Sequence, residues 1–489
     1  MYDNFYITRN KRREKCFKLL INNMKGKTMK RVLVGGLITI FVLSLIFMGV
    51  GCKTTTAAEA TTAAEATTVP DATTGEVTNL RMSVVSGMQE KKLEAVILEY
   101  KKTHPNINVT LDIAGNDITY QDTAITLFSS DDCPDLAFYW IDGGAYQTMS
   151  KNGVLESLTD IYQSENLSSS ISKAIIDAYT FSGDGNQYAI PSDTVLFTLL
   201  FYNKAIFEEL GITAPTMPKP YMQLDEFYEA TDKMKAAGYL PLSVGGKDPW
   251  HTELLAESVV NTMITVDKFT DLTWNWKPGS TPTTHFTDPD YLAGFSLLKE
   301  WSDKNIIAEG YLGRDNIEAQ ELFLSSKAAM FEMGSWWAAG LGDAVPEGFE
   351  YGWMLVPQVK PDIIPKLGVY SGDGIVVPKK GKHMAEAKEL AKFFASEKAA
   401  EIIALSGVIP AREDVPADIL SKNLGPMCTE WIQTLSTNGS FTDSGQGWPS
   451  ILRQEYLAIQ QEMLSGTMTV EEFGKDLEAT AEKLRSGVE

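Results

Sequence analysis

Short apolar runs alternate with amphipathic stretches along most of this chain, and this alternation constrains the fold more than any other feature. Residues 80–86, 107–113 and 134–140 are apolar runs of strand length, and residues 91–104 and 120–129 place apolar side chains at helical spacing. Strands that alternate with helices are typical of an α/β fold with parallel sheets. We therefore expect an α/β fold.

The alternation continues to the end of the chain. Residues 195–202 and 329–333 are strand-like, and helical spacing recurs at residues 224–237, 254–262, 291–304, 318–324, 385–396, 398–406, 453–464 and 470–485. About 410 residues in one repeating pattern exceed what a single hydrophobic core usually holds. We therefore expect two lobes.

A basic and then apolar stretch precedes this body. Residues 29–53 open with two basic residues, continue through mostly apolar residues and end at a glycine followed by Cys52, which are the parts of an export signal. The Cys after a small residue resembles the lipobox of bacterial lipoproteins, in which the thiol is acylated and becomes the new N-terminus. The alternative is an uncleaved membrane span over residues 32–50. Both interpretations place the rest of the chain outside the cytoplasm and tethered to a membrane.

The segments on either side of the signal have no core-forming pattern. We expect residues 1–51 to be leader and signal peptide, with residues 1–28 as upstream sequence and a translation start at Met24 or Met29. Residues 52–79 are rich in Thr and Ala and contain a doubled TTAAEA unit, which is typical of a flexible stalk.

Charge and motifs exclude several function classes. The net charge is −21 and residues 1–51 are basic, so the body is strongly acidic and repels nucleic acid. The chain has no GxGxxG, GxxxxGK[ST], HExxH or GxSxG motif, and its four His are scattered, so we expect no enzyme, no cofactor and no metal. Cys133 and Cys428 could form a disulfide or remain two buried thiols, and the sequence leaves both open.

Five segments, in order along the chain, carry a resemblance to a known family. They are PDLAFYW with GVLESL (134–140 and 153–158), YAIP with FYNK (188–191 and 201–204), LFLSSKAAMFEMGSWW (322–337), LGVYSGDGIVVP with AKELAKFFAS (367–378 and 387–396), and GVIPARED (407–414). With them the chain resembles the family 1 extracellular solute-binding proteins of ABC importers, the maltose-binding-protein-like branch that binds sugars and oligosaccharides.

The resemblance implies a type II periplasmic-binding-protein-like fold of two lobes, with hinge strands and a ligand cleft between the lobes. Lobe 1 would be residues 80–192 plus 368–412, and lobe 2 residues 196–365 plus 416–489. It implies a monomer that captures a carbohydrate, closes around it and delivers it to an ABC permease, and that catalyses nothing itself. With Cys52 as lipid anchor, we expect it on the outer face of a Gram-positive-type cell membrane.

A sugar site needs aromatic rings that stack on C–H faces and polar groups that bind hydroxyls. Trp336 matches the stacking Trp of the family and follows a strand-like run, so that it and its neighbour should face opposite sides. Trp250 and Trp448 follow loop-like sequences, although core packing accounts for most buried Trp in general. The aromatic candidates are Trp336, Trp337, Trp250, Trp448 and, as an outer wall for a longer glycan, Trp274 and Trp276.

Polar candidates follow the predicted strands or lie at the predicted crossings between lobes. Asp373 is the strongest, because its flanking glycines let a ligand approach the backbone. The alternative for each is a turn or helix-start role. The set is Asp373 with Gly372, Asp142 with Tyr139 and Trp140, Asp193 with Thr194, Glu90 with Gln89, and Asn116.

Two alternative functions stay open. The same fold could report a sugar to a membrane histidine kinase, or it could carry a non-sugar solute such as a polyamine to an importer. A polyamine site needs several carboxylates in the cleft, whereas a sugar site depends on its aromatic rings.

Overall fold

The computed structural model describes residues 77–487, with gaps at residues 116, 142–143, 182, 342–344, 417 and 421–424. The described residues belong to one compact unit that begins at Thr74. The predicted leader, stalk and lipidation site at Cys52 lie outside the described residues, as do Asn116 and Asp142. Within the described part, none of the helices has both the length and the apolar composition needed to cross a membrane.

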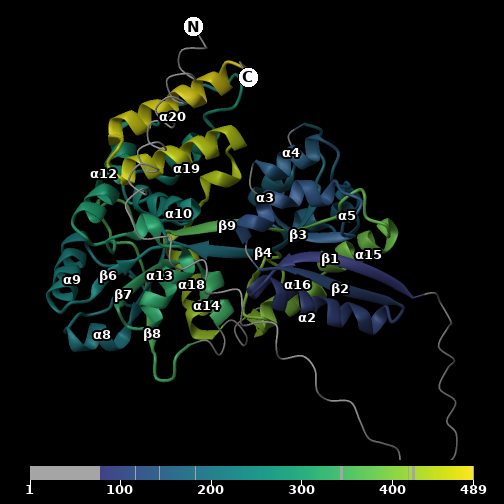
Figure 1. The fold of residues 1–489 in the computed structure, drawn as a ribbon, viewed down its shortest axis with the longest axis horizontal. Coiled ribbons are helices and arrows are strands. Elements are labelled where there is room, and N and C mark those ends of the chain that lie inside the picture. The colour runs from purple at the N-terminus through teal and green to yellow at the C-terminus, as the bar shows by residue number, and fades with distance from the viewer. Residues whose placement is uncertain are drawn as a thin grey trace, which may run out of the picture. The chain divides into compact units, whose positions relative to one another are not determined.

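The first sheet gathers strands from distant parts of the chain (Figure 1). β1 (Thr78–Val85) lies between β2 (Ile107–Ala114) and β3 (Leu136–Trp140) and runs parallel to both. β9 (Leu367–Val376) pairs antiparallel with β3 and with β4 (Ala189–Phe197). Two short strands complete the sheet, namely β10 (Ile409–Pro410) beside β4 and β11 (Ser440–Thr442) beside β9.

The second sheet has the order β6-β7-β5-β8. Its strands are β5 (Leu199–Asn203), β6 (Leu240–Ser243), β7 (Ala328–Met333) and β8 (Tyr351–Leu355). β6 and β7 are parallel, whereas β5 runs antiparallel to both β7 and β8. The expectation of parallel sheets was therefore wrong in part. β9 runs antiparallel to its neighbours in the first sheet, and β5 runs antiparallel to its neighbours in the second.

The single strand expected at residues 195–202 is two strands that belong to different sheets. The break falls at Thr198, whose φ of 74° is in the left-handed region. The Thr198 hydroxyl accepts a hydrogen bond from the Gly368 N–H at 2.7 Å, which fixes the turn against β9. No Gly or Pro marks this turn, and an uninterrupted apolar run does not reveal it.

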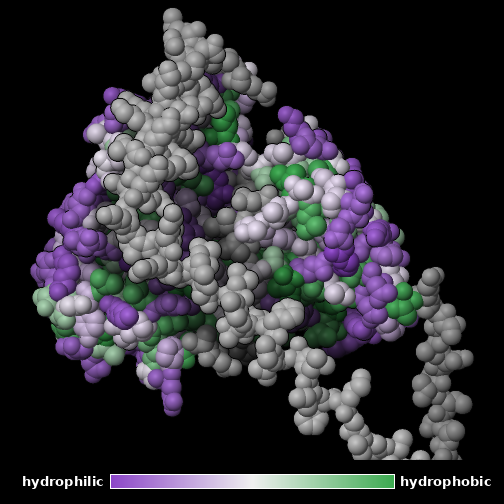
Figure 2. Space-filling view, in the orientation of Figure 1, coloured by the Kyte–Doolittle hydropathy of each residue, from purple (hydrophilic) through white to green (hydrophobic). Residues whose placement is uncertain are grey.

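Helices cover both sheets (Figure 1). Their outer surface over α8 and α9 is mainly hydrophilic (Figure 2). The helices divide between the cores of the two sheets. Those in the core of the first sheet are α2 (Met88–Thr103), α3 (Asp117–Phe128), α4 (Ala145–Lys151), α5 (Thr159–Ser164), α6 (Leu167–Ser170), α7 (Lys173–Tyr179), α15 (Met384–Phe394) and α16 (Glu397–Leu405). Those in the cores around the second sheet are α8 (Lys204–Glu209), α9 (Leu224–Ala236), α10 (Pro249–Val260), α11 (Val266–Trp274), α12 (Pro289–Asp303), α13 (Asn316–Leu324), α14 (Ser335–Leu341), α18 (Gly425–Asn438), α19 (Ser450–Leu464) and α20 (Val470–Arg485). Two 3₁₀ turns are η1 (Tyr311–Gly313) and η3 (Ser444–Gln446).

The strands β4 and β9 connect the hydrophobic core of the first sheet with the cores around the second sheet. Ile190 and Ile375 pack in the core of the first sheet, whereas Leu196 and Leu367 pack with residues of the second sheet. The register between these strands shifts on both sides of Asp193, so their pairing is least regular where they pass from one core to the other.

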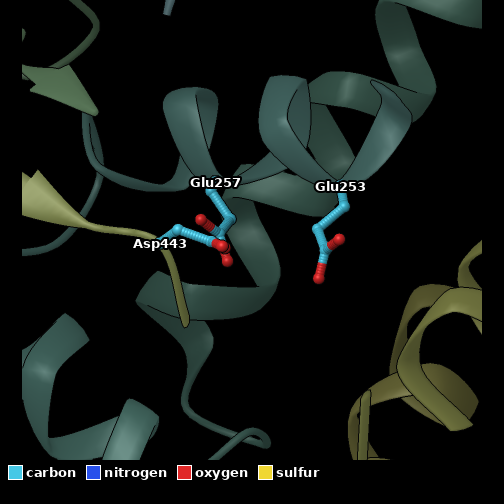
Figure 3. A group of neighbouring side chains, drawn as sticks. All are labelled: Glu253, Glu257 and Asp443. Carbon is cyan, nitrogen blue, oxygen red and sulfur yellow. The ribbon is translucent and has the colours of Figure 1, made fainter. Parts of the chain in front are cut away.

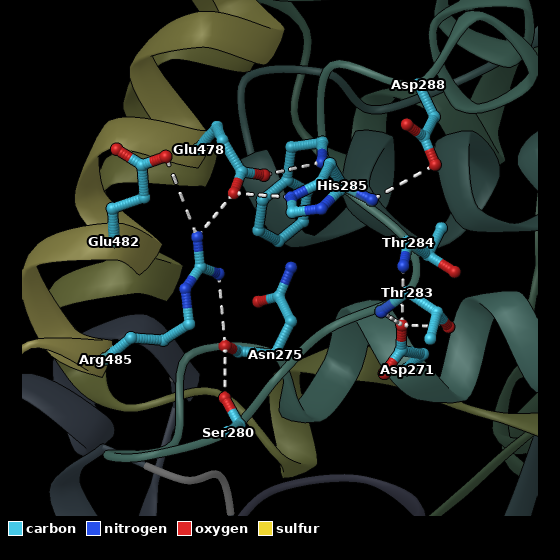
Figure 4. Close-up of polar contacts among 11 residues, drawn as sticks. Asp271, Asn275, Ser280, Thr283, Thr284, His285, Asp288, Glu478, Glu482 and Arg485 are labelled. Carbon is cyan, nitrogen blue, oxygen red and sulfur yellow. Dashed lines mark hydrogen bonds and ion pairs between the residues drawn. The ribbon is translucent and has the colours of Figure 1, made fainter.

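The C-terminal helix α20 is held by a polar network (Figure 4). Glu478 lies 2.9 Å from His285 Nδ1 and accepts a bond from Arg485 at 2.6 Å and from the Phe286 N–H at 2.8 Å. Burial raises the pKa of Glu478, but these three bonds outweigh it, so that the pKa lies below its usual value. Arg485 also donates to the carbonyl of Asn275 at 3.1 Å, which attaches the helix to the loop after α11.

The two cysteines of the body are both free and buried. Burial raises the pKa of Cys133 to about 11 and that of Cys428 to about 12. The disulfide alternative was therefore wrong, and the two-thiol alternative is confirmed.

Candidate functional site

The ends of several helices converge where the two sheets approach each other. α2, α3 and α4 each begin after one of the parallel strands β1, β2 and β3, whose carboxyl ends lie on the same edge of the first sheet. α10 and α14 likewise follow the parallel strands β6 and β7 of the second sheet. The carboxyl ends of parallel strands are where α/β proteins form ligand sites, and helix N-termini leave N–H groups without partners in the helix.

Two close approaches bring helices of the two sheets together, one at the last turn of α14 and one at the starts of α4 and α19. Met88 at the start of α2 lies near α14, since a Cβ placed on Gly340 would be 3.7 Å from its Cβ. A Cβ placed on Gly144, which precedes α4, would collide with Ser450 at the start of α19, so only glycine allows this approach. A small cavity between the sheets is lined by Met88, Val195, Ser335, Trp336, Ala339 and Ile409, among others.

Trp336 and Trp250 form an aromatic pair beside this cavity. Trp336 is half-buried on the first turn of α14, and Trp250 is half-buried on the first turn of α10. Their ring centroids are 6.1 Å apart and the rings are inclined by 57°. The Trp336 ring folds back over Gly334, where any Cβ would collide with it. We call Trp250 and Trp336 the aromatic platform.

Trp337 differs from Trp336 for a reason that sequence reasoning misjudged. The pair lies on a helix and not on a strand, so strand alternation does not explain their orientation. Trp337 is buried among Phe201, Phe323 and Phe331, and its Nε1 donates to Gln320 Oε1 at 2.9 Å. The structure therefore gives Trp337 a core role.

The other tryptophan candidates lie around η3. Trp448 is 2 % exposed and packs on Tyr456 in the core, which leaves its ring inaccessible in this conformation. Trp276 donates from Nε1 to the carbonyl of Gly447 at 2.9 Å, and so braces the loop that precedes α19. Trp274 is exposed at the end of α11, with the Lys277 ammonium 3.9 Å from its ring centroid.

Asp373 and Asp193 lie in a buried polar network whose third member, Lys92, was not predicted. The two carboxylates are register partners on β9 and β4, and Lys92 on α2 pairs with Asp193 and lies 3.9 Å from Asp373. Gln89 donates to Asp373. Burial and the charge of Asp193 raise the pKa of Asp373 from 3.8 to about 7, although Lys92 and Gln89 act against this. The sequence signal that could have indicated Lys92 is its position on the apolar face of a helix, where a lysine needs a buried acidic partner.

The remaining candidates have local partners. Thr194 and Ser371 place their hydroxyls 3.0 Å apart across β4 and β9, and the Gly372 carbonyl accepts from the Ile141 N–H at 2.5 Å. Glu90 accepts from the Gly87 N–H at 3.4 Å and caps α2, which is the helix-start alternative. Tyr139 is buried in the core of the first sheet, whereas Trp140 at the end of β3 is half-buried.

One acidic trio in the described part of the chain brings its oxygens close enough to hold a metal ion (Figure 3). Glu253 and Glu257 lie on α10 and Asp443 precedes η3, with ligand atoms within 4.8 Å of one another. Arg453 on α19 pairs with Glu253 at 3.0 Å, and burial raises the pKa of Glu257 well above its usual value. Glu253 thus ties α10 to α19 through Arg453, and Glu257 ties α10 to η3 by accepting from the Ser444 N–H at 3.2 Å.

Comparison with known proteins identifies the family. The sequence profile described as "Bacterial extracellular solute-binding protein" matches residues 86–401. An uncharacterised ABC transporter extracellular-binding protein of Pyrococcus horikoshii is 24 % identical over 89 % of this chain and 94 % of its own length. The multiple sugar-binding protein of Streptococcus mutans is 23 % identical over 64 % of this chain and 70 % of its own.

Solved structures share the fold. A chitin oligosaccharide binding protein superposes with a TM-score of 0.67 at 21 % identity and covers 83 % of this chain and 100 % of its own. The maltose-bound MalE3 of T. maritima gives a TM-score of 0.63 at 17 % identity over 84 % and 99 %. The expected α/β fold of periplasmic sugar-binding proteins and the expected absence of catalysis as a family property are confirmed. The chain belongs to the bacterial extracellular solute-binding proteins, the non-catalytic binding components of ABC transporters.

Proposed function

We propose that this protein captures a carbohydrate in a cleft between two lobes, built around the two sheets, and delivers it to an ABC permease. The observation that carries the proposal is the aromatic platform of Trp250 and Trp336, placed beside the small cavity that Met88 of α2 and Trp336 of α14 both line. Two rings inclined by 57° offer separate faces to the C–H surfaces of a sugar, and nearby N–H groups can bind its hydroxyls.

The connection between the sheets supports a closing motion. β4 and β9 pass from one set of cores to the other, and their register is irregular at Asp193. A ligand that contacts groups on both sides stabilises the closed arrangement relative to the open one. We propose these strands as the hinge, with lobe boundaries as the sequence predicts.

The proposal includes attachment to the membrane. We propose acylation at Cys52, with residues 53–79 as a stalk that holds a monomeric body outside a Gram-positive-type cell. The order of basic, apolar and Cys residues before the stalk supports this. Mass spectrometry of the mature N-terminus tests it, because an unmodified or uncleaved N-terminus would refute acylation.

A thermal-shift screen tests the ligand class. Mass action raises the melting temperature for any ligand that binds only the folded protein, so one family of mono- or oligosaccharides should shift it. Trp336→Ala should weaken binding at least about tenfold, because it removes an aromatic anchor. Tyr239→Ala is the matched control, since Tyr239 is also half-buried but its hydroxyl bonds to Glu209 at the edge of the second sheet.

A polyamine ligand is less well supported. The carboxylates considered for it are Asp142, which lies outside the described residues, and Asp373, which is buried and lies 3.9 Å from the Lys92 ammonium. A shift from polyamines and none from any sugar would overturn the carbohydrate proposal. Adjacent permease genes would favour import, whereas adjacent histidine-kinase genes would favour the sensing alternative.

A further inference from the structure

We propose that His251 and Glu332 act as a buried positioning pair, which holds Trp250 against Trp336 and thereby sets the shape of the aromatic platform. This inference rests on the proposed function for its effect on binding. Both residues are 0 % exposed. His251 follows Trp250 on the first turn of α10, and Glu332 lies on β7, four residues before Trp336.

The hydrogen bonds of His251 define the state of its ring. Its Nδ1 accepts from the Gly245 N–H at 3.1 Å, so the proton of the neutral ring is on Nε2. Nε2 lies 2.6 Å from the Glu332 carbonyl oxygen and 2.8 Å from Glu332 Oε2. The carbonyl oxygen accepts the hydrogen bond from Nε2, whereas neither carboxylate oxygen of Glu332 has a hydrogen-bond partner among the described residues. Both nitrogens are therefore fixed.

Ring contacts transmit this constraint to the platform. The His251 ring stacks on Trp250, with centroids 5.2 Å apart and an angle of 16°. Its edge meets Phe331 at 6.0 Å and 89°, so the imidazole cannot rotate without displacing a core residue. Trp250 in turn contacts Trp336. A ring held before the ligand arrives loses less conformational freedom on binding.

The placement of the pair explains why it acts on both rings. Trp250 and Trp336 come from separate helices; His251 lies next to Trp250 on α10, and Glu332 lies on β7, which leads into α14. One contact therefore ties the two segments together directly behind the platform. A buried polar side chain with few partners lowers stability, so core packing alone would favour an apolar residue at position 332.

The test begins with a spectroscopic readout that needs no ligand. Two indoles 6.1 Å apart couple and give an exciton signal in far-ultraviolet circular dichroism. Trp353 and Trp431 are a second pair at 6.1 Å and keep their own signal, so the readout is the part of the spectrum that Trp250→Phe and Trp336→Phe each remove. His251→Leu should also lose it, while Glu332→Gln, which keeps a hydrogen-bonding group and the shape, should retain most of it. His285→Leu is the matched control, because it breaks another His–Glu pair remote from the platform and should leave the signal intact.

The sugar found by the thermal-shift screen supplies the second readout. His251→Leu should weaken its binding about tenfold and His285→Leu should not. If His251→Leu does not fold, His251→Gln, which retains a donor but no ring, replaces it. An unchanged exciton signal in either folded variant overturns the positioning role. If no sugar binds the wild type, the proposed function fails, whereas the exciton signal still decides the inference.

Discussion

Asp373→Asn should change how the stability of this protein depends on pH. The folded state raises the pKa of Asp373 from 3.8 to about 7, chiefly through burial and the charge of Asp193. Folded Asp373 therefore holds its proton more tightly than unfolded Asp373, so its contribution to stability is present below about pH 4 and is lost as the pH rises through about 7. A shift of about three pKa units corresponds to about 4 kcal/mol.

Asn cannot titrate but keeps the size of the side chain and an acceptor for Gln89. Relative to the wild type, Asp373→Asn should therefore gain about 4 kcal/mol in free energy of unfolding between about pH 4 and about pH 8. Urea unfolding of both proteins across this range measures the difference, and Asp476→Asn, at an exposed position on α20, is the control. A difference that does not vary with pH, or that falls as the pH rises, would refute the reasoning.

Three further predictions concern the frame around the site. Trp337→Ala should lower the free energy of unfolding by about 3–5 kcal/mol in urea, because Trp337 is a core residue, and a loss below about 1 kcal/mol would contradict this. Glu478→Gln should cost about 1–3 kcal/mol at neutral pH through its lost ionic bonds. Because the folded state lowers the pKa of Glu478 below its usual value of 4.5, that cost should be full above 4.5 and should be lost as the pH falls through the lowered pKa; a cost that stays constant in acid would contradict this. Cys133 and Cys428 should react with a thiol reagent only in denaturant, as located by mass spectrometry; labelling of the native protein would show that they are accessible.

Local periodicity was sufficient for most of the secondary structure. The helix expected at residues 470–485 is α20 (Val470–Arg485), which buries one face, and the strand expected at 107–113 is β2 (Ile107–Ala114), whose alternate apolar side chains pack partly buried against the first core. The break at Thr198 was invisible, since it is fixed by a bond to Gly368, a residue far along the chain. The helical first turn at Trp250 was also missed, because the sequence before it is typical of a loop.

The sequence predicted which residue types form the candidate site, but it did not predict which of the candidate side chains are buried in the core. Trp336 and Trp250 come together as an aromatic pair, whereas Trp337 and Trp448 are in the core. Their difference depends on how helices pack, which spacing along the chain does not specify. Lys92 was missed because its partners Asp193 and Asp373 lie on strands contributed by distant segments.

A crystal structure of the protein with its best-binding sugar would test the central claim most directly. We predict a sugar ring stacked on Trp336, with Trp250 against the same sugar or its neighbour and with groups from both sheets in contact with the ligand. A ligand bound elsewhere, with neither ring in contact with it, would contradict the assignment of the aromatic platform as the binding site.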